Sequence, residues 1–248
     1  MSIEIKTEDL RIRIGNDEIL KGITVDAKQG EILSIIGPAG AGKTTFLRSL
    51  NRMSELDPDI KTSGKITLDG GSIYDLQVST LRRQVGMVFS VPIPLPMTVY
   101  ENLTFGVRLV KGRGNSYDEH VERALRAAAL WEEMKDRLNE PARNLSGGQQ
   151  QRLCLARTLA LDPKVLLLDE PCSGLDPIST ARIEDALRQL KSNLAIILVT
   201  NNVKQAARAS DRTAFFLFGE LIELDVTNQL FTTPGDQRTA DYISGRFG

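Results

Sequence analysis

Short apolar runs alternate with stretches of helical spacing at both ends of the chain. The run at 32–36 is almost wholly apolar and is followed by a glycine, as expected for a buried strand before a turn. Residues 165–168 form a second run of this kind. Other apolar segments alternate with polar residues, which is typical of half-buried strands. Together these patterns predict strands within 3–14, 22–36, 65–70, 85–89, 165–168 and 195–200, and helices at 43–53 and 178–191.

The middle of the chain has a different pattern. Prolines at 92, 94 and 96 exclude a regular helix or a central strand and favour an extended segment. Because strands and helices alternate on both sides of this region, the sequence predicts an α/β fold with a parallel sheet and a helical insertion. From 99 to 160 the apolar residues follow helical spacing, with one helix face marked by Val121, Leu125, Ala128 and Ala129.

Composition narrows the class of protein. The 248 residues suit one domain with an inserted subdomain, and 41% hydrophobic with 25% charged residues is ordinary for a globular protein. The formal net charge of −1 does not favour nucleic-acid binding. No apolar run reaches the roughly 18–20 residues that span a bilayer, and the N-terminus lacks a signal-peptide pattern, so we expect no direct membrane insertion. Cys154 and Cys172 fit reduced, buried thiols better than a disulfide.

A glycine-rich loop lies between the strand at 32–36 and the helix at 43–53. It matches the pattern G-x-x-x-x-G-K-[ST], in which glycines let backbone N–H groups approach phosphates and the helix N-terminus adds partial positive charge. Lys43 is expected to reach the β- and γ-phosphates of ATP, and the Thr44 hydroxyl to bind Mg²⁺. The residues predicted to contact the nucleotide here are Gly37, Pro38, Ala39, Gly40, Ala41, Gly42, Lys43, Thr44 and Thr45.

Two carboxylates follow the apolar run at 165–168. In a parallel sheet this end of a strand lies at the edge where ligands bind. Asp169 is expected to hold Mg²⁺ through the water shell that this ion retains. Glu170 is the candidate general base, because it would polarise the water that attacks the γ-phosphate.

A second phosphate cradle is predicted at 145–149, directly before a helical run. Ser146 is a suitable residue to begin a helix, Gly147 and Gly148 leave backbone N–H groups open to an anion, and Gln149 completes the candidate site. One chain does not need two cradles for one nucleotide. A symmetric pair does, because the cradle of one chain faces the phosphate loop of the other.

The order of these motifs resembles that of the ABC transporter ATPase family. The phosphate loop, the segment at 145–149, the acidic pair at 169–170 and the segment at 173–176 follow one another as in that family, and the resemblance covers nearly the whole chain. It implies a P-loop ATPase with a RecA-like parallel-sheet core, an antiparallel N-terminal β region and a helical subdomain. It also implies that Asp176 belongs to a loop that crosses the dimer interface.

The resemblance further implies boundaries, partners and location. An ABC ATPase domain would span 3–243, with its core at 1–90 and 161–248 and a helical subdomain at 91–160. The cofactors would be ATP and Mg²⁺. The partners would be a second copy of the chain in an ATP-dependent head-to-tail dimer and transmembrane permease subunits, at the cytoplasmic face of the cell membrane. The segment at 91–96 would then be either a plain linker or part of the groove in which a permease docks.

Several further stretches are similar to one branch of the family, the ATP-binding subunits of bacterial phosphate importers. Import of inorganic phosphate is expected from this resemblance alone, because none of these stretches would contact the cargo. They are residues 51–53, 81–89, 129–133, 145–157, 205–211 and 241–248.

Three places depart from the family's pattern. Ser90 stands where the family has a glutamine that contacts Mg²⁺, and Asn201 stands where it has a histidine beside the γ-phosphate; the only histidine of this chain is His120. The stretch that usually offers an aromatic for adenine has Arg13, whose guanidinium would cover the base, and Ile14, which would pack against it. A working, diverged importer subunit and a slow or regulatory ATPase both remain compatible with the sequence, as does import of another anion.

Overall fold

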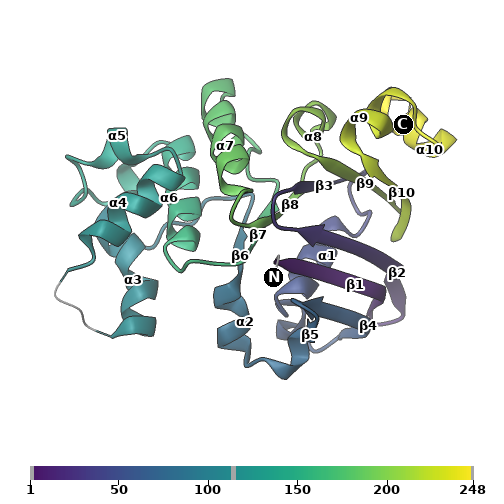
Figure 1. Cartoon of the computed structure of the whole chain (residues 1–248), viewed down its shortest axis with the longest axis horizontal. Coiled ribbons are helices and arrows are strands. Elements are labelled where there is room, and N and C mark those ends of the chain that lie inside the picture. The colour runs from purple at the N-terminus through teal and green to yellow at the C-terminus, as the bar shows by residue number, and fades with distance from the viewer. Residues whose placement is uncertain (1–2, 113–115, 247–248) are drawn as a thin grey trace.

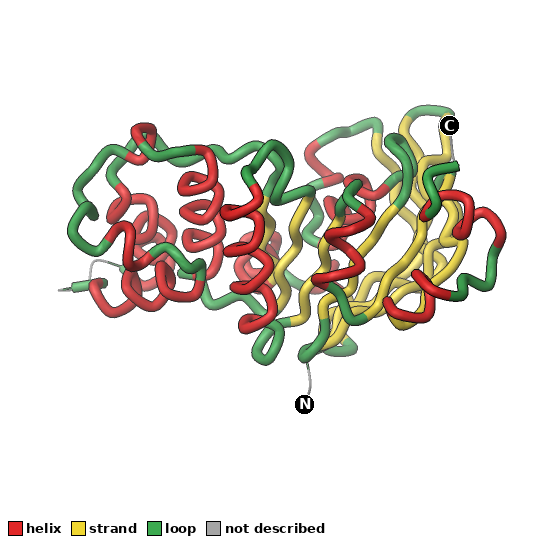
Figure 2. Tube along the Cα trace, turned by 90° about the horizontal axis from the view of Figure 1, so that it is seen from above, coloured by secondary structure: helices red, strands yellow, loops and turns green. Residues whose placement is uncertain are grey.

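A computed structural model describes residues 3–112 and 116–246 of the chain. Figure 1 shows a group of helices on one side, two sheets on the other, and helix α7 between them. Figure 2 shows the same division from above, with the strands gathered at one end of the molecule and most of the helices at the other. The last two residues of the similar stretch at 241–248 lie outside the described part.

The N-terminal sheet is antiparallel, as expected, and its strands follow the order β2-β1-β4-β5. In its central pairings Ile12 of β1 lies opposite Leu20 of β2 and opposite Thr62 of β4. Two of these strands begin earlier than the sequence pattern indicated, because polar residues at their exposed ends hide the start of the alternation. The strands are β1 (Glu4–Ile14), β2 (Asp17–Lys28), β4 (Ile60–Leu68) and β5 (Gly71–Ser72).

The second sheet has six strands in the order β10-β9-β3-β8-β7-β6. The strands from β9 to β6 are mutually parallel, and β10 pairs antiparallel with β9 at one edge. The prediction of a parallel sheet is confirmed, although β9 and β10 were not recognised in the sequence. The strands are β3 (Ile32–Ile36), β6 (Val85–Val88), β7 (Val165–Asp169), β8 (Ala195–Val199), β9 (Arg212–Leu217) and β10 (Glu220–Val226).

Both faces of the six-stranded sheet are buried. On β7, Val165 and Leu167 join a core that includes the N-terminal sheet, whereas Leu166 and Leu168 join a core shared with the helical region. Such a strand has no solvent face, and its sequence is therefore continuously apolar. Helix α1 (Lys43–Leu50) lies between the two sheets and contributes Phe46 to the first core.

The helical region lies between β6 and β7 in sequence. Its helices are α3 (Val99–Lys111), α4 (Asp118–Ala127), α5 (Trp131–Met134) and α6 (Gly147–Leu159). One detail of the predicted helix face is wrong: Ala129 is exposed, has a φ of 51° and follows the end of α4. The residue that joins Val121 and Leu125 in the buried face is Ala124, because a helix turns by 3.6 residues.

Four short helices and α7 complete the fold. Helix α7 (Pro177–Leu190) packs between the helical region and the sheet. The other four are α2 (Val78–Gln84), α8 (Val203–Ala209), α9 (Thr227–Thr232) and α10 (Gln237–Ile243). Three 3₁₀ turns lie at Ser54–Leu56, Ile73–Asp75 and Ala142–Asn144.

Candidate nucleotide-binding and hydrolysis site

Four parallel strands bring the predicted site residues to one edge of the sheet. Strands β3, β8, β7 and β6 are adjacent and end in register, since Ile35 lies opposite Val199 and Val199 lies opposite Asp169. The phosphate loop, Asn201, Glu170 and Ser90 follow these four strands in the same spatial order. Residues far apart in sequence therefore meet at the carboxyl ends of the strands, where ligands bind in open α/β sheets.

The backbone of the phosphate loop requires glycine. Gly37 has a φ of +151°, and a Cβ there would lie 2.1 Å from the backbone oxygen of Phe216. Gly42 has a φ of +93° and precedes the first turn of α1. A Cβ on Gly40 would meet nothing within 4 Å, so that side of the loop is open for a phosphate.

Lys43 folds back over this loop. Its Nζ donates to the backbone oxygens of Gly37 at 2.7 Å and Pro38 at 2.8 Å. Burial lowers the pKa of Lys43, and the carboxylates of Glu170 and Asp169 act against that shift. The buried ammonium of Lys43 is held by two carbonyl oxygens and flanked by carboxylates. A polyanion such as a triphosphate would give this cation further negative partners and so bind favourably.

The expected metal ligands contact each other. The Thr44 Oγ1 donates to Asp169 Oδ1 at 3.0 Å. Among the described residues there is no group of three or more His, Cys, Asp or Glu side chains that could hold a metal ion. A hydroxyl and one carboxylate fit Mg²⁺ only if phosphate oxygens and water complete its octahedron.

Glu170 has an unusual backbone. It follows β7 with a φ of 48°, and its N–H donates to the Val199 oxygen at 2.9 Å. Left-handed backbone in a non-glycine residue is concentrated at functional sites. The Nδ2 of Asn201 donates to Glu170 Oε1, so the residue that replaces the family's histidine contacts the candidate base directly.

The second cradle begins helix α6. Ser146 and Gln149 form a capping box, in which each side chain accepts from the other's backbone N–H. A Cβ on Gly147 would meet nothing within 4 Å, which agrees with an anion site. Gly148 is buried, and a Cβ there would lie 2.3 Å from Ser179 Oγ. The absence of a side chain at Gly148 therefore lets α6 pack closely against α7, and its backbone N–H stays a candidate donor to the anion.

Asp176 caps α7. Its Oδ1 accepts from the N–H groups of Ile178 and Ser179, both at 2.9 Å. The Ser179 hydroxyl donates to Oδ2 at 2.6 Å, and these hydrogen bonds lower the pKa of Asp176. The exposed loop before Asp176 is thus held beside the start of α6.

The other two departing places, Ser90 and the stretch with Arg13 and Ile14, lie as follows. Ser90 is half-buried and follows β6, and the preceding oxygen, of Phe89, accepts from Gln151 Nε2 of α6 at 2.7 Å. Arg13 is exposed at the end of β1. Ile14 is half-buried and lines a hollow of about 410 Å³ together with Thr45.

His120 is far from this edge in the fold. It lies on α4 in the helical region, where its ring is 6.2 Å from the ring of Tyr117. No residue of that helix belongs to the four strand ends. The histidine of the chain therefore does not replace Asn201 spatially.

Sequence reasoning missed several supporting residues. Arg152, 2% exposed, joins α6 to Glu133 at 2.7 Å, and Glu133 also accepts from Gln149 at 2.8 Å. From the other side, Tyr242 of α10 reaches the backbone of Gly37. The similar stretches at 129–133, 145–157 and 241–248 contained the missed residues Glu133, Arg152 and Tyr242, but only as part of a resemblance. Their contacts could not be inferred because each partner is distant in sequence.

Comparison with known proteins agrees with the site. The family model described as ABC transporter matches residues 20–173, which is more than half of the chain. The protein therefore belongs to the ABC transporter family, as its ATP-binding and ATP-hydrolysing part. A bacterial Atm1-family ABC exporter with ATP bound has the same fold, with a TM-score of 0.83 and 25% identity, over 100% of this chain and 43% of the exporter chain. This likeness confirms the predicted fold class.

The curated relatives are more specific. The phosphate import ATP-binding protein PstB of Oceanobacillus iheyensis is 52% identical over 251 residues, covering 100% of this chain and 91% of the relative. PstB of Bacillus cereus is 51% identical over 245 residues, covering 98% and 90%. The predicted resemblance to the phosphate-importer branch is thereby confirmed.

Proposed function

We propose that this protein hydrolyses ATP at the edge formed by β3, β8, β7 and β6. The observation that carries the proposal is the convergence of the phosphate loop, the Thr44–Asp169 pair and Glu170 at these strand ends. Lys43 and the loop N–H groups would bind the β- and γ-phosphates, and Glu170 would take a proton from the attacking water. Bound Mg²⁺, held by Thr44 and Asp169, would neutralise charge on the phosphates.

The site is proposed to be completed by a second copy of the chain. The exposed Gly147 and the capped start of α6 would form an anion cradle for the nucleotide of the partner copy. A twofold pair would use both cradles and both loops. The residues assigned to this half-site are Ser146, Gly147, Gly148, Gln149 and Asp176.

The cargo proposed is inorganic phosphate, imported through transmembrane permease subunits. Support comes from the two relatives named as phosphate import proteins. None of the described helices is long and apolar enough to cross a membrane. The exposed apolar residues Phe89, just before the proposed helical subdomain 91–160, and Val91 and Ile93, at its start, are suited to contact the permease. We place the protein at the cytoplasmic face of the membrane.

Slow turnover is proposed for the isolated chain. The amide of Asn201 is engaged by Glu170, and an amide carries no titratable charge for the departing phosphate. Ser90 has a shorter side chain than glutamine and reaches a metal less directly. Slow turnover would fit a diverged importer subunit as well as a regulatory ATPase.

Substitution Glu170→Gln tests the proposed function. It removes the base and leaves both cradles intact, so Mg-ATP should trap a dimer that size-exclusion chromatography with light scattering detects. In the assembled transporter the same variant should lose ATP-driven uptake of labelled phosphate. A variant that stays monomeric in saturating Mg-ATP and still hydrolyses it would refute the composite site. If the assembled transporter with the parent protein takes up another anion but not phosphate, the proposed cargo is wrong.

A further inference from the structure

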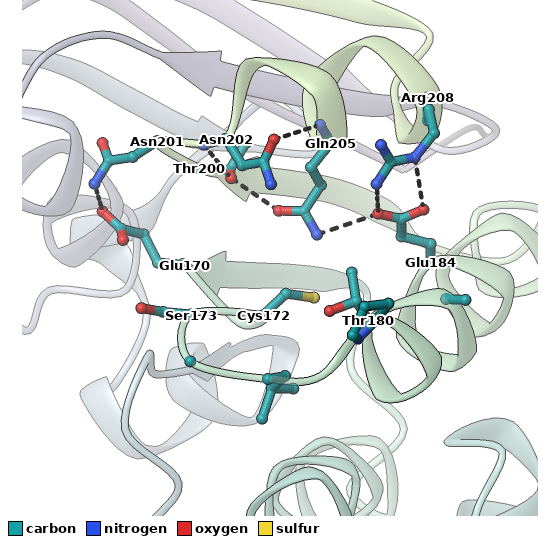
Figure 3. A pocket seen from close by; sticks show the side chains of 14 residues that line it. Glu170, Cys172, Ser173, Thr180, Glu184, Thr200, Asn201, Asn202, Gln205 and Arg208 are labelled. Carbon is teal, nitrogen blue, oxygen red and sulfur yellow. Dashed lines mark hydrogen bonds and ion pairs between the residues drawn. The ribbon is translucent and has the colours of Figure 1, made fainter.

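A cavity of about 780 Å³ opens beside Glu170, between the loop that precedes α7 and the helices α7 and α8. Figure 3 shows its polar side chains following one wall, from Glu170 and Asn201 at one end to Glu184 and Arg208 at the other. The proposed hydrolysis uses the first end only. The second end has a buried carboxylate that no step of hydrolysis employs.

That carboxylate belongs to Glu184 of α7, whose side chain is 5% exposed. Its Oε1 accepts from Arg208 Nη2 at 2.9 Å and from Gln205 Nε2 at 3.5 Å, and its Oε2 accepts from Arg208 Nε at 3.4 Å. Arg188 lies 3.8 Å from the same group. A buried carboxylate is costly without donors, so these contacts must be retained for the fold to tolerate it.

The carboxylate determines how Gln205 is oriented. Because an ionised carboxylate only accepts hydrogen bonds, the amide nitrogen of Gln205 must face Glu184. The amide oxygen then faces the other way, where it accepts from Thr200 Oγ1 at 2.8 Å. Gln205 and Thr200 are both buried where they border the cavity.

The hydrogen bonds continue in a fixed donor-to-acceptor order from Thr200 to the hydrolysis site. Thr200 gives its one hydroxyl hydrogen to Gln205, which leaves the oxygen to accept from the Asn202 N–H at 3.0 Å. The Asn202 side chain in turn accepts from the Gln205 N–H at 3.1 Å. These bonds hold the turn that presents Asn201, and Asn201 donates to Glu170.

We propose that Glu184 is a positioning residue for ATP hydrolysis, acting through the directed chain Gln205, Thr200 and the 200–202 turn to hold Asn201 against Glu170. The proposal rests on the proposed role of Glu170 as the base. Glu184 also lies on the helix that Asp176 caps. This series of hydrogen bonds therefore connects the turn beside Glu170 to α7, the helix that begins at the proposed dimer interface.

The decisive variants keep side-chain size and change only donors and acceptors. Glu184→Gln can turn an amide nitrogen towards Gln205, which reverses that amide and removes the acceptor of Thr200. We expect kcat to fall about tenfold to a hundredfold with little change in KM, because the base is displaced while the phosphate loop is untouched. Gln205→Glu alone puts two carboxylates side by side, so we expect its melting temperature to fall.

The double variant Glu184→Gln/Gln205→Glu restores the donor-to-acceptor direction of the hydrogen bonds between residues 184, 205 and 200. The new carboxylate at 205 accepts from Thr200 and from the new amide at 184, whose oxygen still accepts from Arg208. We expect kcat to return to within about threefold of the parent, a strongly non-additive result for two residues in contact. If Glu184 only stabilised the fold, Glu184→Gln would lower the melting temperature in parallel with kcat, and the double variant would not recover kcat.

Two comparisons make the outcome unambiguous. Glu31→Gln alters a half-buried glutamate that accepts from Arg212 at 3.1 Å, at the opposite end of β3, and should leave kcat unchanged. Glu170→Gln is measured beside it: if that variant keeps parental turnover, the proposed base is wrong. If Glu170→Gln is inactive but Glu184→Gln keeps parental kcat, or if the double variant folds normally and does not recover, the positioning role of Glu184 is overturned.

Discussion

Replacement of Asn201 by histidine and of Ser90 by glutamine should raise ATP turnover of the isolated protein. The perturbation is local, because Asn201 follows β8 and Ser90 follows β6, and only β7 lies between these two strands of the parallel sheet. Asn201 has one amide donor group, and that amide is bound to Glu170 Oε1. Because an amide stays neutral, Asn201 offers no positive charge to the departing phosphate, whereas the family's histidine could.

The expected size of the effect follows from the cost of a missing donor. Loss of one donor aimed at developing charge typically reduces kcat by about 10²–10³. Asn201 retains part of this function by holding Glu170, so Asn201→His should regain about tenfold of that loss. Ser90→Gln should add a smaller gain through the metal. The combined effect should differ from the product of the two, since both act on one phosphoryl group.

The assay is steady-state phosphate release at saturating Mg-ATP for the parent, both single variants and the double variant. Melting temperatures of all four identify any variant that is merely unstable. His120→Asn serves as the matched control, because this side chain lies on α4 and should have no effect on turnover. A parent that already turns over as fast as the double variant would refute the reasoning, and Asn201 would then be a full functional substitute.

Two further predictions concern binding and thiol chemistry. Lys43→Ala removes charge-assisted hydrogen bonds worth about 1.5–3 kcal/mol each and should abolish tight ATP binding in calorimetry, whereas Lys164→Ala, which removes a surface partner of Asp69, should not. Burial raises the pKa of Cys172 from 9.0 to about 11, so iodoacetamide should label it slowly at pH 8 and faster as pH rises towards 11. Because the folded pKa is the higher one, this thiol stabilises the fold below pH 9 and loses that contribution as pH rises through 11; rapid labelling of the native protein at pH 8 would contradict both statements.

The sequence by itself determined the features that depend on neighbouring residues. A glycine-rich loop between an apolar strand and a helix has few alternatives, because the glycines, Lys43 and Thr44 all act within one turn of backbone. The continuous apolar run at 165–168 likewise predicted a strand buried on both faces, which is β7. The acidic pair after this strand could then be placed at the ligand-binding edge.

Only the tertiary structure decided which distant side chains meet. The close approach of Gly148 to Ser179 could not be inferred from the glycine-rich segment at 145–149. The pairing of Arg152 with Glu133, and of Glu184 with Gln205 and Arg208, joins residues whose separation along the chain carries no periodic signal. Such contacts depend on the angle at which two helices pack and on the direction of each side chain. Both are set by the whole core, and for this reason no local pattern in the sequence could predict them.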